Sequence, residues 1–337
     1  MHMADALLSP AVGGTLWVAT GATLAWCARR VKARADDRIV PLMGVLGAFV
    51  FAAQMINFAI PGTGSSGHLG GGQLLAILLG PHAAFLVLAS VLTVQALFFA
   101  DGGLLALGAN LFNLGVFPCF VAYPLVYRLV AGDKPSDGRL AFAAVLAAVL
   151  GLQMGALGVV VETVGSGLTS LAFATFAALM LPIHLGIGLV EGAATAALVI
   201  FLRRARPDLV DRSLPAPVKS RAVAGLAIAA ALVAGVLSWF ASPHPDGLEW
   251  SIARATGTEE IKPPEGGLHA RLAAIQEKLS VLPDYDLPAE GTAKKEGETA
   301  WPEVSGGRSF AGLVGGLVTL LVVAAAGWLL GRRRPVA

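Results

Sequence analysis

Two stretches of the sequence carry nitrogen donors that could bind one metal ion together. The chain begins with Met1 and His2, and His68 lies in a glycine-rich run between residues 61 and 72. A terminal amine, the amide nitrogen of residue 2 and its imidazole can chelate one cation through adjacent five- and six-membered rings. A second imidazole completes a plane of four nitrogens, which is typical of Ni(II) or Cu(II). The sequence therefore predicts a metal site formed by Met1, His2 and His68.

This donor set would select its ion by chemistry as well as by geometry. Deprotonation of a backbone amide requires a strongly polarising divalent ion. Extending or acylating the amino terminus would therefore destroy the site. Three polar side chains are candidates to accept a hydrogen bond from a ligating histidine and so to orient it. They are Asp101, Asn110 and Asn113.

Other acids lie in or near apolar runs, where a charged group is costly and therefore indicates function. They are Asp5, Glu162 and Glu191. The two cysteines, Cys27 and Cys119, both lie inside apolar runs and are predicted to be small buried side chains. The sequence therefore indicates neither a disulfide framework nor a thiolate metal site.

Two nucleotide-binding interpretations of the chain can be rejected. Gly62, Gly64 and Gly67 match G-x-G-x-x-G, but that fingerprint requires a preceding strand and a βαβ unit, whereas apolar spans flank this loop. The sequence contains no G-x-x-x-x-G-K-[ST] motif, so it cannot bind ATP through a P-loop. The glycines instead indicate a backbone that folds tightly against another segment.

The composition is that of a membrane protein. Of 337 residues, 56% are hydrophobic and 14% are charged, and the mean hydropathy is +0.73. Apolar runs near the ~20 residues needed to cross a bilayer recur along the chain. They lie at about 11–28, 40–59, 104–130, 140–161, 169–202, 221–241 and 309–331.

Residues 72–100 are also apolar but are broken at Gly80 and Pro81, which predicts a short segment going in and a longer one returning. The sequence therefore predicts an all-α fold, a polytopic transmembrane helical bundle of about nine crossings with a small external segment.

Lysine and arginine are sorted by side of the membrane. Of the 24 basic residues, 17 lie in four short segments and the other seven lie in the hydrophilic stretch 242–308. The four segments are 29–38, 128–139, 203–221 and 332–334. Because short basic loops stay cytoplasmic and long domains escape this rule, the amino terminus is predicted outside and the carboxyl terminus in the cytoplasm. His2 and His68 then share the outer side, and His82 lies toward the opposite one.

The composition also predicts a division into domains. Residues 1–205 form the metal-binding membrane domain, and 206–217, rich in arginine and proline, form a cytoplasmic linker. Residues 218–337 form an accessory domain, in which two transmembrane helices flank the external segment 242–308. We expect that segment to be loosely structured, with one short helix at 268–280.

Several motifs resemble one known family. The start Met1-His2-Met3-Ala4-Asp5, the loop 62–68 followed by 76–81, and the stretch 95–110 are similar to the CbiM/NikM family. These proteins are the substrate-binding (S) components of energy-coupling-factor (ECF) transporters for cobalt and nickel. The resemblance covers about 1–205. Residues 245–249, with the sequence Pro-Asp-Gly-Leu-Glu, resemble the accessory PDGLE (NikN/CbiN-like) domain, here fused to the carboxyl end.

The resemblance implies a subunit that captures Ni2+ or Co2+ outside a plasma (bacterial inner) membrane through Met1, His2 and His68. It implies a transmembrane coupling component and two ABC ATPase subunits as partners, which supply the energy for uptake. The metal is the transported substrate, and no organic cofactor, nucleic-acid partner or enzymatic activity is expected. The loop around His68 and the four-nitrogen chemistry favour nickel, and cobalt uptake that feeds cobalamin synthesis is the alternative.

Two other classes of function make different demands on the sequence. An intramembrane metal-dependent enzyme usually carries an H-E-x-x-H helix, which this sequence lacks. An ion-coupled secondary transporter would have inverted repeats and charged residues at the midplane, and the sequence shows no convincing repeat.

Overall fold

The computed structural model describes residues 2–34, 39–207, 220–258, 261–262, 266–287 and 301–331. Three sequence predictions fall wholly or partly outside these residues. They concern Met1, most of the linker 206–217, and parts of the external segment 242–308.

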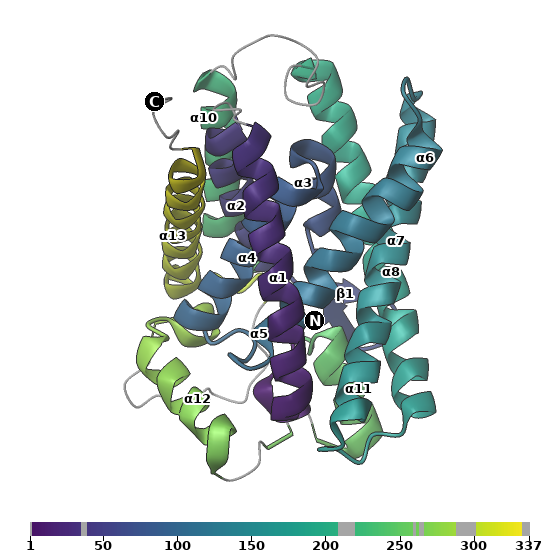
Figure 1. The fold of residues 1–337 in the computed structure, drawn as a ribbon, viewed down its shortest axis with the longest axis vertical. Helices are drawn as coiled ribbons and strands as arrows, with labels where there is room; N and C mark the ends of the chain where they lie inside the picture. The colour runs from purple at the N-terminus through teal and green to yellow at the C-terminus, as the bar shows by residue number, and fades with distance from the viewer. Residues whose placement is uncertain are drawn as a thin grey trace.

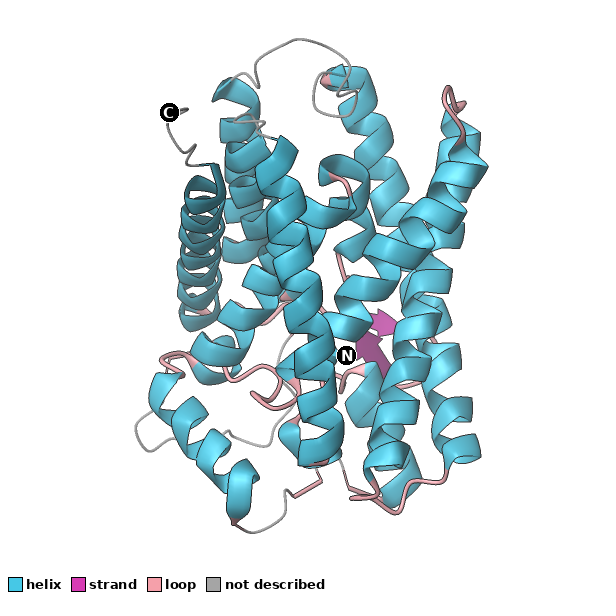
Figure 2. Cartoon of the chain, viewed as in Figure 1, coloured by secondary structure: helices cyan, strands magenta, loops and turns pink. Residues whose placement is uncertain are grey.

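The described chain is a bundle of helices (Figures 1 and 2). Six segments are long and apolar enough to cross a membrane, and α2 and α10 are shorter apolar helices. The main helices are α1 (Pro10–Arg34), α2 (Ile39–Gln54), α3 (Gly72–Leu79), α4 (Pro81–Phe98), α5 (Leu107–Leu111), the π-helical η2 (Phe112–Tyr127), α6 (Arg128–Ala131), α7 (Asp137–Ser166), α8 (Phe173–Ala205), α10 (Ser220–Gly235) and α13 (Gly306–Gly331). The predicted all-α membrane bundle is confirmed.

The predicted break at Gly80 separates two helices of very different length. Gly80 has φ 72°, which a residue with a side chain rarely adopts, and Pro81 occupies the first turn of α4. α3 has 8 residues and is about 12 Å long, much less than a bilayer core of about 30 Å. The number of nine crossings therefore stays a prediction.

One crossing segment departs from regular α-helix. Residues Phe112–Tyr127 are π-helical, with Pro118 and Pro124 inside the segment. Proline removes a backbone donor and clashes with the preceding turn, so the i→i−4 ladder cannot continue there unchanged. Hydropathy locates this span, but it does not predict its helical type.

The amino-terminal segment and a short hairpin lie side by side in the lower half of the bundle in Figure 1. The short helix η1 (Asp5–Leu7) precedes α1, and a hairpin of β1 (Phe58–Ile60) and β2 (Ser65–Gly67) precedes α3. α1 is about 37 Å long, so its basic carboxyl-terminal end lies at the opposite end of the bundle.

The described part of the external segment is more ordered than predicted. It contains α11 (Gly247–Thr256), α12 (Gly267–Leu279) and η4 (Pro283–Tyr285), and the helix predicted at 268–280 is confirmed. The buried side chains of Leu248, Ile252 and His269 dock these elements on the membrane domain. Apolar burial thus orders the described helices, although the surrounding composition is hydrophilic.

Close helix packing depends on small residues, and this gives a testable prediction. A Cβ added at Gly188 of α8 would lie 2.8 Å from the Cα of Val149 on α7. Because that contact is to backbone, Gly188→Ala is expected to destabilise the protein by about 1–3 kcal/mol. Gly14→Ala in α1, where a Cβ meets nothing within 4 Å, is the matched control and is expected to be neutral or slightly stabilising. Thermal unfolding in detergent measures both changes, and equal midpoints would contradict the packing argument.

Candidate metal site

The residues after His2 are fixed in a buried position. Met3 is fully buried, its N–H donates to Asn110 Oδ1 at 2.8 Å, and its carbonyl accepts from Asn110 Nδ2 at 3.2 Å. Gly103 N–H also donates to the Met3 carbonyl at 2.9 Å. A Cβ added at Gly103 would lie within 2.4 Å of the Asp5 backbone nitrogen, so only glycine allows this approach. The loop after α4 therefore holds the amino-terminal segment in place.

His68 is positioned by its own hairpin and by buried polar groups beneath it. The Glu191 carboxylate on α8 accepts hydrogen bonds from the N–H groups of Gly70 and Gly71, at 2.7 Å and 3.1 Å. Gln54 Nε2 donates to the Gly70 carbonyl at 2.8 Å, and Gln95 Nε2 donates to Gln54 Oε1 at 2.9 Å. These contacts supply hydrogen-bond partners for the backbone of a loop that enters the bundle without regular secondary structure.

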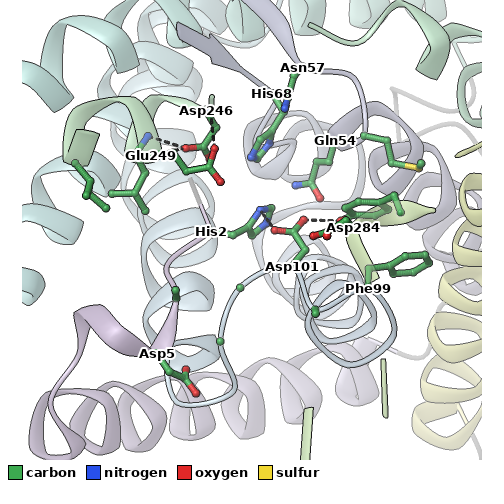
Figure 3. Close-up of a pocket in the computed structure, with 18 of the residues that line it drawn as sticks. His2, Asp5, Gln54, Asn57, His68, Phe99, Asp101, Asp246, Glu249 and Asp284 are labelled. Atoms are coloured by element: carbon green, nitrogen blue, oxygen red, sulfur yellow. Dashed lines mark hydrogen bonds and ion pairs between the residues drawn. The ribbon is translucent and has the colours of Figure 1, made fainter. Parts of the chain in front are cut away.

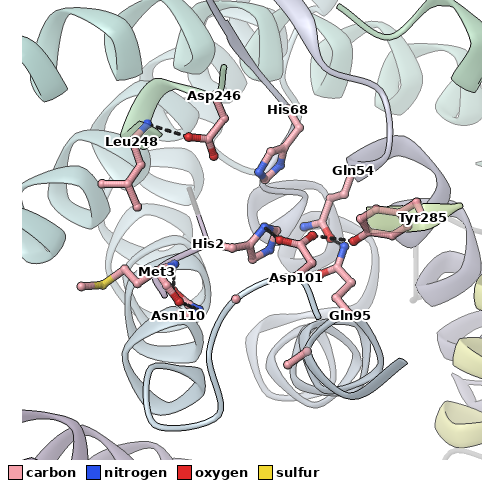
Figure 4. Close-up of polar contacts among 12 residues, drawn as sticks. His2, Met3, Gln54, His68, Gln95, Asp101, Asn110, Asp246, Leu248 and Tyr285 are labelled. Atoms are coloured by element: carbon pink, nitrogen blue, oxygen red, sulfur yellow. Dashed lines mark hydrogen bonds and ion pairs between the residues drawn. The ribbon is translucent and has the colours of Figure 1, made fainter. Parts of the chain in front are cut away.

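The two predicted imidazole ligands face each other. The rings of His2 and His68 are stacked, with centroids 4.9 Å apart and planes inclined by 7°. His2 Nδ1 lies 3.0 Å from Asp101 Oδ1. His2 Nε2 is buried and has no hydrogen-bond partner among the described residues. Figure 4 shows His68 reaching from the hairpin toward His2, with Asp101 beside the His2 ring.

Asp101 is in turn held by the external segment. The Tyr285 hydroxyl donates to Asp101 Oδ2, and the Tyr285 ring stacks on Phe99 with centroids 4.7 Å apart. Burial and the charge of Asp101 raise the pKa of Tyr285 well above its usual value, so the hydroxyl remains a donor. The structure thus forms a connected series from His2 through Asp101 to Tyr285.

The electrostatics favour neutral imidazole at His68 and an ionised Asp101. Burial lowers the pKa of His68 to about 3, so its ring is neutral at physiological pH. Burial alone would raise the pKa of Asp101, but His2 and the Tyr285 hydroxyl hold it below the usual range. A neutral imidazole has a lone pair free for a metal, and metal ligation requires that form.

These residues line a cavity of about 610 Å³. Figure 3 shows His2, His68, Asp101 and Asp246 pointing into the same space. Gln54, Glu249 and Asp284 also line it, and the external segment supplies the last two together with Asp246. We call this cavity, with its His2–His68 pair, the histidine chamber.

The structure brings together some of the predicted site residues and separates others. His2, His68 and Asp101 meet in the histidine chamber, and Asn110 orients the backbone next to His2. Asn113 does not line the chamber, because its Nδ2 donates to Glu162 Oε2 at 2.8 Å deeper in the bundle. Met1 lies outside the described residues. Among the described residues, no three His, Cys, Asp or Glu side chains are grouped so that they could hold a metal ion.

Two histidines outside the predicted site have other surroundings. His82 begins α4 and packs edge-on against Trp26, with ring centroids 4.6 Å apart. His184 on α8 is buried, and its Nδ1 lies 2.8 Å from the Met180 carbonyl oxygen. Neither lines the histidine chamber.

Sequence reasoning missed residues of the external segment and gave Glu191 no specific role. Tyr285 and Gln276 come from the external segment, and Gln276 Nε2 donates to the carbonyls of Ala96 and Gly102 beside the chamber. Glu191 was identified only as a costly buried acid. The Pro-Asp-Gly-Leu-Glu motif at 245–249 was the one local signal that the external segment contributes to function.

The buried Glu191 carboxylate gives a second prediction. Glu191→Ala leaves the Gly70 and Gly71 N–H groups without their acceptor, at about 1–3 kcal/mol for each buried unsatisfied group. Because these amides anchor the His68 loop, we also expect the affinity of the predicted metal site to fall by about 10- to 100-fold. Glu162→Ala is the matched control, since it removes a buried acid that does not line the chamber. It is expected to lower stability but to leave affinity unchanged. A parallel loss of affinity in both variants would contradict the anchoring role.

The fold and the chamber together define a class of protein: a multi-pass membrane protein with a buried, stacked histidine pair within its helical bundle. Residues 2–209 match the family model of the cobalt uptake substrate-specific transmembrane region, CbiM, and residues 220–332 match the PDGLE domain. The chain belongs to the CbiM family and carries a carboxyl-terminal PDGLE domain.

Several known proteins are similar over most of this chain. A putative fused nickel transport protein of Archaeoglobus fulgidus is 34% identical over 86% of this chain and 89% of its own length. A cobalt transport protein of Geobacter sulfurreducens is 32% identical over 79% of each chain. A crystal structure of a truncated transition metal transporter, 32% identical, superimposes with a TM-score of 0.54 over 61% of this chain and 99% of that chain.

Proposed function

We propose that this chain is the substrate-binding membrane subunit of an ATP-driven ECF importer that captures Ni2+ outside the plasma membrane, with Co2+ as the alternative substrate. The observation that carries the proposal is the stacked pair of His2 and His68 in a buried chamber. Relatives described as nickel and cobalt transport proteins support a metal substrate of this kind. No enzymatic step is required of a binding subunit.

The proposed coordination uses four nitrogens: the Met1 amine, the His2 amide and imidazole, and the His68 imidazole. The six-membered chelate ring requires His2 Nδ1, which faces Asp101 in the structure. Binding therefore requires the His2 ring to turn over about its Cβ–Cγ bond. That turn moves Nε2, the nitrogen without a partner among the described residues, to the side on which Asp101 lies. A carboxylate that accepts from the distal N–H is a common way to orient a ligating histidine.

We propose that the histidine chamber opens to the outside. The charge distribution supports this orientation, because 17 of the 24 basic residues lie in short segments predicted to be cytoplasmic. The amino terminus is then outside and the carboxyl terminus in the cytoplasm of a bacterial inner membrane. Energy comes from a transmembrane coupling component and two ABC ATPase subunits, because the sequence has no P-loop motif.

Vesicle experiments test whether this chain binds the ion without transporting it by itself. The purified chain in lipid vesicles is expected to bind Ni2+ at one ion per chain but to move none inward under a proton gradient. Gradient-driven accumulation by the chain alone would instead indicate an ion-coupled secondary transporter.

Competition between Ni2+ and Co2+ on the same preparation separates nickel from cobalt as substrate. Planar nitrogen coordination is expected to favour Ni2+. Tighter binding of Co2+ would favour the cobalt alternative.

A further inference from the structure

The amino-terminal turn of α11 is a rigid structure built by the Pro-Asp-Gly-Leu-Glu motif. Asp246 is the N-cap, and its Oδ1 accepts hydrogen bonds from Leu248 N–H at 2.8 Å and Glu249 N–H at 2.9 Å. Glu249 Oε2 accepts in return from Asp246 N–H at 3.1 Å. This reciprocal capping box fixes the position of the Asp246 carboxylate.

The same turn is docked directly on the hairpin that carries His68. Ser66 N–H donates to the Pro245 carbonyl at 2.8 Å, and Ser66 Oγ donates to the His244 carbonyl at 2.8 Å. Trp250 Nε1 donates to the Thr63 carbonyl at 3.0 Å. The motif and the residues that flank it are thus joined to β2 and its turn by hydrogen bonds from Ser66 and Trp250.

Packing against α8 completes the docking. A Cβ added at Gly247 would lie 2.6 Å from Ile183 Cγ2 and 3.3 Å from His184 Cε1. Glycine at this position therefore allows α11 to approach the membrane domain closely. The contacts leave the Asp246 side chain directed into the histidine chamber, on the other side of His68 from Gln54 (Figure 4).

The chamber needs negative charge if it is to hold a divalent ion. Two imidazoles and an amine are neutral donors and the deprotonated His2 amide supplies one negative charge, so the complex with a divalent ion keeps a positive charge. Burying that charge is costly unless a carboxylate lies near it. The membrane domain supplies Asp101, and the carboxyl-terminal domain supplies Asp246.

We propose that Asp246 is a functional residue of the metal site, whose carboxylate balances the charge of the bound divalent ion from the side opposite Asp101. The inference rests on the proposed function. It makes the fused PDGLE domain a part of the binding site, because the Asp246 carboxylate faces the chamber only when α11 is docked on the His68 hairpin.

Asp246→Asn tests the charge separately from the fold. Asparagine is as good an N-cap as aspartate, so the variant keeps the Leu248 and Glu249 hydrogen bonds and loses only the charge. Competition titration of the purified full-length protein with Ni2+ is expected to show a loss of affinity of about 10- to 100-fold. The thermal unfolding midpoint of the metal-free protein is expected to stay unchanged.

Glu277→Gln is the matched control. It makes the same charge change in the same external segment, but the Glu277 side chain is exposed and does not line the chamber. Its Ni2+ affinity is expected to stay within about threefold of the unaltered protein, since exposed charges are screened by solvent. An equal loss in both variants would overturn a specific role for Asp246.

The remaining outcomes separate this inference from the proposed function. Stoichiometric Ni2+ binding by both the unaltered protein and Asp246→Asn, with the same affinity, would overturn the role of Asp246 and leave the proposed function standing. Failure of the unaltered protein to bind Ni2+ would overturn the proposed function and this inference with it.

Discussion

Replacing His68 with alanine is expected to weaken Ni2+ binding by more than about 100-fold, the upper end of what loss of a hydrogen-bond partner behind a ligand costs. The reason is that His68 supplies the fourth nitrogen, and the described residues that line the chamber include only His2 and His269 as other histidines. His269 is already engaged, because its Nε2 lies 2.8 Å from the Leu8 carbonyl oxygen. Among the described residues that line the chamber, no other histidine is therefore placed to replace the lost nitrogen.

The control for this variant is His244→Ala. His244 lies next to the docked turn, and its side chain is exposed. Its contact with Ser66 uses the backbone carbonyl, which the substitution keeps. Isothermal titration or competition with a coloured chelator measures both affinities. Retention of near-normal Ni2+ affinity in His68→Ala, with a folded protein, would remove His68 from the proposed ligands.

Adding one residue before Met1 is expected to abolish Ni2+ binding at concentrations that saturate the unaltered protein. The addition converts the Met1 amine into an amide and moves the new amine beyond the chelate rings. The chain cannot slide to compensate, because Met3 is fully buried and bonded to Asn110 through both its N–H and its carbonyl. Slippage by one residue would break both bonds and bury a different side chain.

The matched control carries the same added residue after Ala337, the last residue of the sequence. It is expected to bind Ni2+ like the unaltered protein. Metal content after desalting, measured by mass spectrometry of the element, compares the two. Undiminished binding with the extended amino terminus would rule out the terminal amine as a ligand and direct the search to Asp101 and Asp246.

The sequence predicted the membrane spans well because hydropathy over long windows is a local property. The long helices α1, α4, α7, α8 and α13 fall where apolar runs were found. The short helix α3 and the π-helical η2 were less predictable, because proline positions and local hydrogen bonding decide their form.

The site was partly predictable for a different reason. His2 and His68 stand out because of their chemistry and their position on one side of the predicted topology. Tyr285 and Asp246 contribute through contacts between distant segments, and no local pattern predicts that a hydroxyl at 285 reaches Asp101. Asn113, predicted as a candidate acceptor for a ligating histidine, does not line the chamber. Its side chain instead turns to Glu162, since three positions along the helix do not guarantee the same environment.

The coordination of bound nickel is the most direct test of this account. X-ray absorption at the nickel edge, on the purified protein loaded with one ion per chain, reports the number, type and arrangement of the donor atoms. Four nitrogen neighbours in a plane, lost when His68 is replaced by alanine, are the predicted result. A six-coordinate shell of oxygen donors, or a spectrum that the replacement leaves unchanged, would contradict a site built from Met1, His2 and His68.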